Sequence, residues 1–161
     1  MKKRCFIVLI FIFGSTLTVN GQNCFQRSII YPLPFMGNNG ELVKLNDDTF
    51  WIVQNSFEYM YSYNANVIVC PQRNIFEING KKIQVEKLTG TILESTIVSD
   101  FDGLEYGNLY KLANGQIWEQ TEPYIWVWIW VYPEVVIYQK GDVYKMKVQN
   151  IDHHVFIERI K

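Results

Sequence analysis

One run of the sequence places residues suited to ligand chemistry at regular spacing. Residues 124–132 read Tyr-Ile-Trp-Val-Trp-Ile-Trp-Val-Tyr, so aromatic and β-branched aliphatic residues alternate without exception. Successive side chains of a strand point to opposite faces, so all the rings would share one face. Aromatic rings stack on sugar faces, and aromatic-lined grooves bind proline-rich peptides. The candidate ligand-binding residues are therefore Trp118, Tyr124, Trp126, Trp128, Trp130 and Tyr132.

The orientation of these rings is open between packing, a ligand platform and oligomer contacts. In an earlier run, residues 56–63, four rings alternate with Ser, Glu, Met and Ser, so one face of the strand would be mostly polar. This alternation predicts that the rings of Phe57, Tyr59, Tyr61 and Tyr63 are buried. By analogy, the sequence favours packing of the later rings in the core or between two halves of the chain. The aliphatic face would then need a cover, such as a homo-oligomer contact through Ile125, Val127, Ile129 and Val131. Five rings would crowd a barrel of about 60 residues, which favours an outside position for some of the three tryptophans.

Catalytic and metal-binding patterns are scarce. His153 and His154 are the only histidines, and neighbours on a strand point to opposite faces, so we expect a solvated turn and no shared metal ion. Asp100, Asp102 and Glu105 supply too few oxygen ligands for calcium and again predict a solvated turn. No Ser-His-Asp set, nucleophile elbow or phosphate-binding loop is found. The sequence favours a non-enzymatic protein without cofactor or metal, and the alternative hydrolase would use the clustered acids Asp100, Asp102, Glu119 and Glu122.

The amino-terminal residues 1–21 have the pattern of a signal peptide. A basic start, Met1 to Arg4, precedes an unbroken apolar run from Phe6 to Phe13 and a small, polar segment. This pattern predicts cleavage between Gly21 and Gln22 and a secreted or periplasmic protein. The apolar run is shorter than the roughly 20 residues of a spanning helix, so no membrane span is expected in the mature chain.

The mature chain is mildly acidic and has two cysteines. Removal of the leader takes away three of the 15 basic residues and none of the 16 acidic ones, which leaves a net charge of −4. Nucleic-acid binding needs a basic surface, so a nucleic-acid partner is not expected. Cys24 and Cys70 are the only thiols left. In an oxidising compartment they are predicted to form a disulfide.

The sequence repeats itself once, which sets the expected domain organisation. Gly-x-Leu-x-Lys-Leu occurs at residues 40–45 and again at 107–112, and Trp51 recurs as Trp118. A spacing of 67 to 68 residues continues through the later strands and matches Tyr59, Tyr61 and Tyr63 with Trp126, Trp128 and Trp130. Turn residues separate short strands in both copies, as expected for small closed or nearly closed barrels. We therefore predict two units, residues 22–90 and residues 91–161.

The second copy also resembles a known family. Its hairpin, residues 114–121, reads Asn-Gly-Gln-Ile-Trp-Glu-Gln-Thr, and this pattern is similar to one in uncharacterised bacterial exported proteins with SH3-like β-barrel units. The first copy departs from it, because residues 46–49 read Asn-Asp-Asp-Thr. The resemblance implies an all-β fold, a tandem pair of SH3-like barrels and export, and it brings no activity.

Taken together, the patterns predict a module of the cell envelope that binds, or has a structural role, through aromatic-rich barrel surfaces. Its partner would be an envelope protein, a peptide or a glycan. A carbohydrate- or peptidoglycan-binding module is the first alternative, and an envelope hydrolase is the second.

Overall fold

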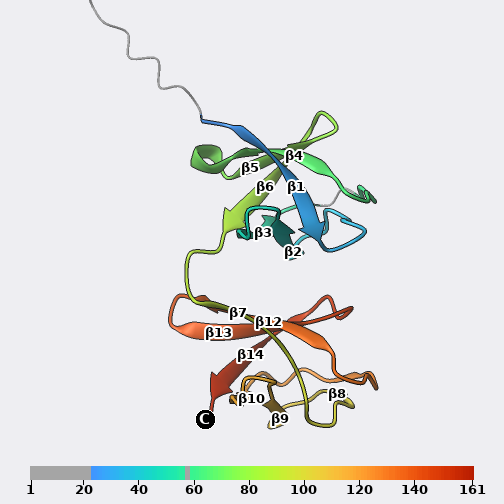
Figure 1. The fold of residues 1–161 in the computed structure, drawn as a ribbon, viewed down its shortest axis with the longest axis vertical. Coiled ribbons are helices and arrows are strands. Elements are labelled where there is room, and N and C mark those ends of the chain that lie inside the picture. The colour runs from blue at the N-terminus through green and yellow to red at the C-terminus, as the bar shows by residue number, and fades with distance from the viewer. Residues whose placement is uncertain (1–22, 57–58) are drawn as a thin grey trace, which may run out of the picture.

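The computed structural model describes residues 23–56 and 59–161, and it is all-β as expected (Figure 1). The predicted signal peptide, its cleavage site and Phe57 lie outside the described residues. Along the part of the chain that is described, no helix is long and apolar enough to cross a membrane.

The amino-terminal half forms a closed six-stranded barrel. Its strands pair in the order β1-β2-β3-β6-β5-β4, and β4 closes onto β1. A 3₁₀ turn, Pro71–Arg73, joins β4 to β5. Alternate side chains point inwards, and residues such as Phe35, Trp51 and Phe76 fill the centre. The strands are β1 (Phe25–Tyr31), β2 (Leu42–Leu45), β3 (Phe50–Gln54), β4 (Asn66–Cys70), β5 (Ile75–Ile78) and β6 (Lys81–Lys87).

The carboxy-terminal half forms a curled six-stranded sheet and a short two-stranded one. The curled sheet has the order β7-β12-β13-β14-β10-β9. Read in the direction β1-β4-β5-β6-β3-β2, the closed barrel has the same order, if the strands of each sheet are counted along the chain. Its ends meet through the isolated bridge between Ile97 and Leu112. The smaller sheet joins β8 to β11. The strands are β7 (Ile92–Thr96), β8 (Gly103–Leu104), β9 (Leu109–Lys111), β10 (Ile117–Gln120), β11 (Trp126–Val127), β12 (Glu134–Lys140), β13 (Val143–Val148) and β14 (His154–Arg159).

An apolar seam joins the barrel to the curled sheet, which lie one above the other in Figure 1. Phe50 and Ile52 of the barrel belong to the same buried cluster as Tyr138 of the sheet. Lys44 Nζ lies 2.7 Å from Glu94 Oε2 across the seam. A second ion pair between the two parts joins the side chains of Glu86 and Lys140. The seam therefore combines burial of apolar surface with exposed charge pairs.

The predicted disulfide is present between Cys24 and Cys70. Cys24 directly precedes β1, and Cys70 is the last residue of β4. Their neighbours Phe25 and Val69 are paired across the two strands. The disulfide therefore joins the two strands that close the barrel.

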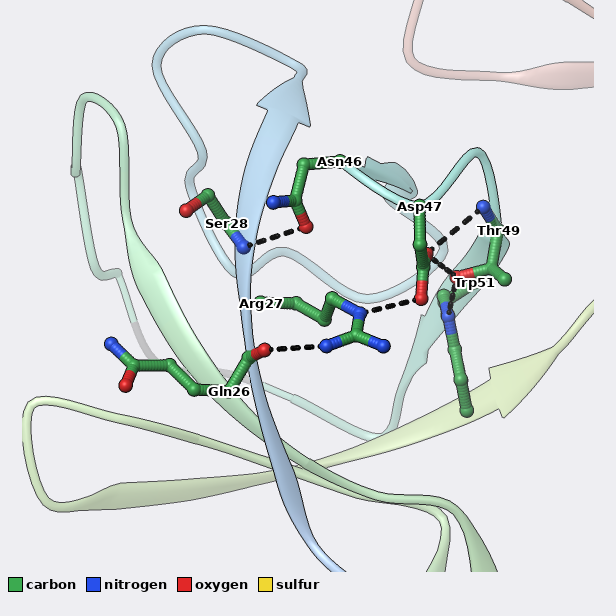
Figure 2. Close-up of polar contacts among 7 residues, drawn as sticks. All are labelled: Gln26, Arg27, Ser28, Asn46, Asp47, Thr49 and Trp51. Atoms are coloured by element: carbon green, nitrogen blue, oxygen red, sulfur yellow. Dashed lines mark hydrogen bonds and ion pairs between the residues drawn. The ribbon is translucent and has the colours of Figure 1, made fainter.

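A polar network fixes the turn between β2 and β3 (Figure 2). Asp47 Oδ1 accepts hydrogen bonds from the backbone amide of Thr49 at 3.2 Å and from its hydroxyl at 2.7 Å. Asp47 Oδ2 accepts from Arg27 Nε on β1 at 2.7 Å. The Thr49 hydroxyl in turn accepts from Trp51 Nε1 at 2.9 Å. The turn, the neighbouring strand and a core tryptophan are thus linked through one carboxylate.

We predict that Asp47→Ala lowers the free energy of unfolding by about 2 kcal/mol at pH 7, because it removes hydrogen bonds to a charged group. Partial burial alone raises the pKa of Asp47, but hydrogen bonds from Thr49 and Arg27 outweigh it and hold the pKa below its ordinary value. The stabilisation is therefore complete above the unfolded pKa and is lost as the pH falls through the folded one.

Urea denaturation of the wild type and the variant between pH 3 and pH 7 measures this effect. Asp48→Asn is the matched control, because the Asp48 side chain is 84% exposed and asparagine tolerates its positive φ of 59°. Equal stability of Asp47→Ala and Asp48→Asn at pH 7 would contradict the assigned role.

Candidate functional site

The residues predicted to form one long aromatic strand form a projecting segment, residues 124–132, which we call the aromatic arm. Only Trp126 and Val127 belong to a ladder, paired with Leu104 and Gly103 of β8. Further along, the amide of Trp128 donates to the carbonyl oxygen of Asp102 at 3.1 Å, and the amide of Trp130 donates to that of Phe101 at 3.3 Å. The arm is therefore bound along one edge to residues 101–104, and the predicted nine-residue strand is wrong in its length.

Gly103 permits the close approach of the two chains. It has a φ of +132°, and a Cβ atom there would lie 2.0 Å from the carbonyl oxygen of Trp126. Any side chain at this position would push the arm away from β8. At the other end, Tyr132 has a φ of 54°, which ends the extended backbone before Pro133.

The rings of the arm are on the surface, so the expected packing in the core is wrong. The side chains of Trp126, Trp128 and Trp130 are 46%, 42% and 37% exposed. Tyr132 is exposed as well, whereas Tyr124 is half-buried. The core of the curled sheet is already filled by other residues, including Phe101, Leu104, Tyr110 and Trp118.

Two indole rings of the arm lie nearly parallel. The ring centroids of Trp128 and Trp130 are 6.1 Å apart, and the ring planes differ by 18°. The predicted exposure of the aliphatic side chains is confirmed, at between 66% and 82% for Ile125, Val127, Ile129 and Val131. The arm therefore presents apolar side chains on both of its faces.

The barrel carries a second exposed row of rings, where burial was expected. Tyr59, Tyr61 and Tyr63 are all more than half exposed. Tyr59 and Tyr61 are stacked with centroids 6.0 Å apart, and the hydroxyls of Tyr61 and Tyr63 are 3.3 Å apart. Met60, between them, packs against the barrel core instead.

The two rows are not related ring by ring, contrary to the sequence match. The amides of Met60 and Ser62 donate to the carbonyl oxygens of Met36 and Phe35. In the curled sheet, Trp128 and Trp130 make the corresponding bonds to Asp102 and Phe101. The backbone therefore aligns Trp128 with Met60 and not with Tyr61, a shift of one residue that exchanges the two faces.

A hollow of about 520 Å³ adjoins the arm. Its lining includes residues 129–132 of the arm, with the rings of Trp130 and Tyr132, and also Asp100, Asp102 and Asn108. Both carboxylates are exposed. The hollow thus combines aromatic faces with carboxylate and amide oxygens, which accept hydrogen bonds from hydroxyl and amino groups.

Buried polar residues anchor the base of the arm, a role that no local pattern in the sequence indicates. Gln120 is fully buried, and its Nε2 donates to the carbonyl oxygens of Tyr124 at 2.7 Å and Glu122 at 2.9 Å. The Tyr110 hydroxyl donates to Gln120 Oε1 at 3.0 Å and lies 3.3 Å from the carbonyl oxygen of Gly103. Burial raises the pKa of Tyr110 to about 12, so the hydroxyl keeps its proton at neutral pH.

His153 supports the same end of the arm. Its ring stacks on Tyr124, with centroids 3.9 Å apart. Its Nε2 lies 2.7 Å from Glu122 Oε1, while Glu122 Oε2 accepts from the amide of Phe156. These contacts give both His153 and Glu122 a positioning role beside Tyr124.

His154 lies in strand β14 and is buried, so the predicted solvated turn is wrong for this residue. Its Nδ1 is 2.7 Å from the hydroxyl of Tyr138, which belongs to the seam. Its Nε2 is buried and has no hydrogen-bond partner among the described residues. Burial, together with the nearby positive charge of Lys147, lowers the pKa of His154 to about 3.

Trp118 and two of the four acids considered for hydrolysis do not lie at the site beside the arm. Trp118 is buried, donates from Nε1 to Gln116 and packs against Tyr144, so it is a core residue and not part of the platform. Of the four acids considered for hydrolysis, Asp100 and Asp102 line the hollow, whereas Glu119 and Glu122 do not. Among residues 23–56 and 59–161, no group of three or more metal-binding side chains occurs.

Comparisons with protein-family models, with curated proteins and with solved structures gave no match.

Proposed function

We propose that this protein is a non-enzymatic module of the cell envelope that binds glycan chains on the aromatic arm. One observation carries the proposal: Trp128 and Trp130 are exposed and nearly parallel, and Trp130 lines a hollow that also contains Asp100, Asp102 and Asn108. Exposed aromatic clusters of this kind are unusual on a protein surface and mark interaction sites.

Sugars match both parts of this site. The apolar face of a sugar ring stacks on an indole, and the hydroxyls at its edge donate hydrogen bonds to oxygen acceptors. Asp100, Asp102 and Asn108 supply such acceptors beside the rings. Two carboxylates on a chain that already has more acidic than basic residues disfavour polyanions. The expected ligands are therefore neutral glycans or glycans of amino sugars.

The remaining features support export and a two-unit organisation. The leader pattern and the Cys24–Cys70 disulfide both fit an oxidising compartment outside the cytoplasm. The shared strand order of the barrel and the curled sheet supports two SH3-like units related by duplication. In this proposal the two units form the scaffold, and the arm forms the site.

Calorimetric titration of the purified protein with hexasaccharides of glucose and of N-acetylglucosamine tests the proposal. We expect saturable binding of at least one of them and none of an acidic polysaccharide such as alginate. Trp130→Ala is expected to weaken binding about 30-fold, the effect of losing one aromatic hot spot.

Trp130→Phe, which keeps a ring, should retain most of the affinity. Val127→Ala, on the opposite face of the arm, is the matched control and should leave binding unchanged. Failure of all the neutral glycans to bind, or equal binding by Trp130→Ala, would overturn the proposed function.

A further inference from the structure

One edge of the aromatic arm has no partner in the described structure. The amides of Trp128 and Trp130 face residues 101 and 102 and donate to them. The amides of Ile129 and Val131 alternate with these and so point to the opposite side. No backbone carbonyl among the described residues accepts a hydrogen bond from them. The outer edge of the arm is therefore open to another strand.

The sequence of the arm does nothing to protect this edge. Proteins usually block an open edge with charged residues, proline or a bulge. Residues 124–132 contain no charged residue and no proline, and no positive φ occurs before Tyr132. The only irregularities are a one-residue slip of Trp128 and Trp130 against Asp102 and Phe101 and a bend that begins at Val131. In the barrel, by contrast, Tyr61 and Asn64 have φ values of 34° and 50°, so the corresponding segment is not extended.

The arm is also self-complementary. Read outwards from Trp128 in either direction, the residue types are the same: aliphatic, tryptophan, aliphatic, tyrosine. In an antiparallel pair centred on Trp128, Val127 of one copy lies opposite Ile129 of the other, and Trp126 lies opposite Trp130. Because residues 127 and 129 direct their amides outwards, they occupy hydrogen-bonded positions in this register.

We propose that two copies of the chain pair through this edge, antiparallel, about a two-fold axis at Trp128. Such an interface uses the same surface on both copies, so the assembly is complete as a dimer. It satisfies the free amides of the arm and forms cross-strand aromatic and aliphatic pairs. The axis is perpendicular to the joined sheet, so the rings of both copies lie on one face and form one continuous platform. The inference goes beyond the proposed function and does not rest on it.

Sedimentation velocity measures the pairing. At about 100 μM, well above the micromolar dissociation constants of ordinary specific dimers, we expect a dimer of the wild type. Ile129→Lys places a charge in the centre of the interface and is expected to raise the dissociation constant at least 100-fold. At a concentration low enough for the wild type to be monomeric, the melting temperatures of the two proteins should agree, because Ile129 is 82% exposed. Tyr59→Lys, in the exposed row of the barrel, is the matched control and should remain dimeric.

A cysteine scan tests the register. In this register Trp128 of one copy lies directly opposite Trp128 of the other. The pair is a non-hydrogen-bonded one, in which the two Cα atoms approach most closely. Under mild oxidation Trp128→Cys should therefore give a covalent dimer, and Tyr59→Cys should not. A monomeric wild type, a series of larger oligomers, or a dimer that persists in Ile129→Lys would overturn the inference. Loss of glycan binding with intact pairing would instead contradict only the proposed function.

Discussion

Removing the Cys24–Cys70 disulfide is expected to lower the free energy of unfolding by about 4 kcal/mol. The disulfide spans a separation of 46 residues, and cross-linking a loop of that size restricts the unfolded chain strongly. It also joins β1 to β4, the pair of strands that closes the barrel. A small barrel buries a limited share of its surface, so it depends more on such a constraint.

Cys24→Ala with Cys70→Ala is the preferred variant, because Cys70 is buried and alanine adds no polar group there. Urea denaturation with and without dithiothreitol measures the effect. Reduction of the wild type should lower its stability to that of the double variant, and dithiothreitol should not change the variant. A loss of less than about 1 kcal/mol would show that the folded barrel does not depend on the disulfide.

The second large effect concerns His154 and acidic pH. Burial holds the folded pKa of His154 at about 3, below the value of about 6.5 for an unfolded histidine. Between these pH values the unfolded chain binds the proton and the folded chain does not. The contribution to stability is therefore complete above pH 6.5 and is lost as the pH falls towards 3, by about 1 kcal/mol per pH unit.

A comparison of urea denaturation between pH 7 and pH 4 isolates this residue. His154→Leu with Tyr138→Phe removes both the titrating ring and the hydroxyl that pairs with it, so the pH dependence should become flatter by about 1 kcal/mol per unit. His153→Gln is the matched control, because it removes the other histidine and leaves the buried pair of His154 and Tyr138 in place, so the slope that is due to His154 should remain. Equal slopes for the wild type and the double variant would contradict the assignment.

Local patterns predicted the features of this protein that depend on local chemistry. Alternation of side chains and turn residues indicated an all-β chain, because both depend on a few neighbouring residues. The pairing of Cys24 with Cys70 followed from their being the only thiols of the mature chain. The exposure of Ile125, Val127, Ile129 and Val131 was predicted too, but from an expected burial of the neighbouring rings that is wrong, since the rings are also exposed.

Features that depend on packing between distant strands were not predictable. Neither face of the aromatic arm is polar, so alternation alone could not indicate which one is buried, and both are exposed. Similarly, the burial of His154 could not be read from its neighbours in the sequence, because it depends on Tyr138 of the seam, whose hydroxyl lies against its ring. The anchor made by Tyr110 and Gln120 required the register of β9 with β10.

Acrylamide quenching of tryptophan fluorescence tests the central claim, that the rings of the arm are exposed and take a glycan ligand. The chain has five tryptophans. Trp51 and Trp118 are buried, whereas Trp126, Trp128 and Trp130 are exposed. We predict two populations, one readily quenched and one protected, and we predict that a neutral hexasaccharide protects the quenched population. A uniformly blue-shifted, unquenched emission that no glycan alters would contradict the account.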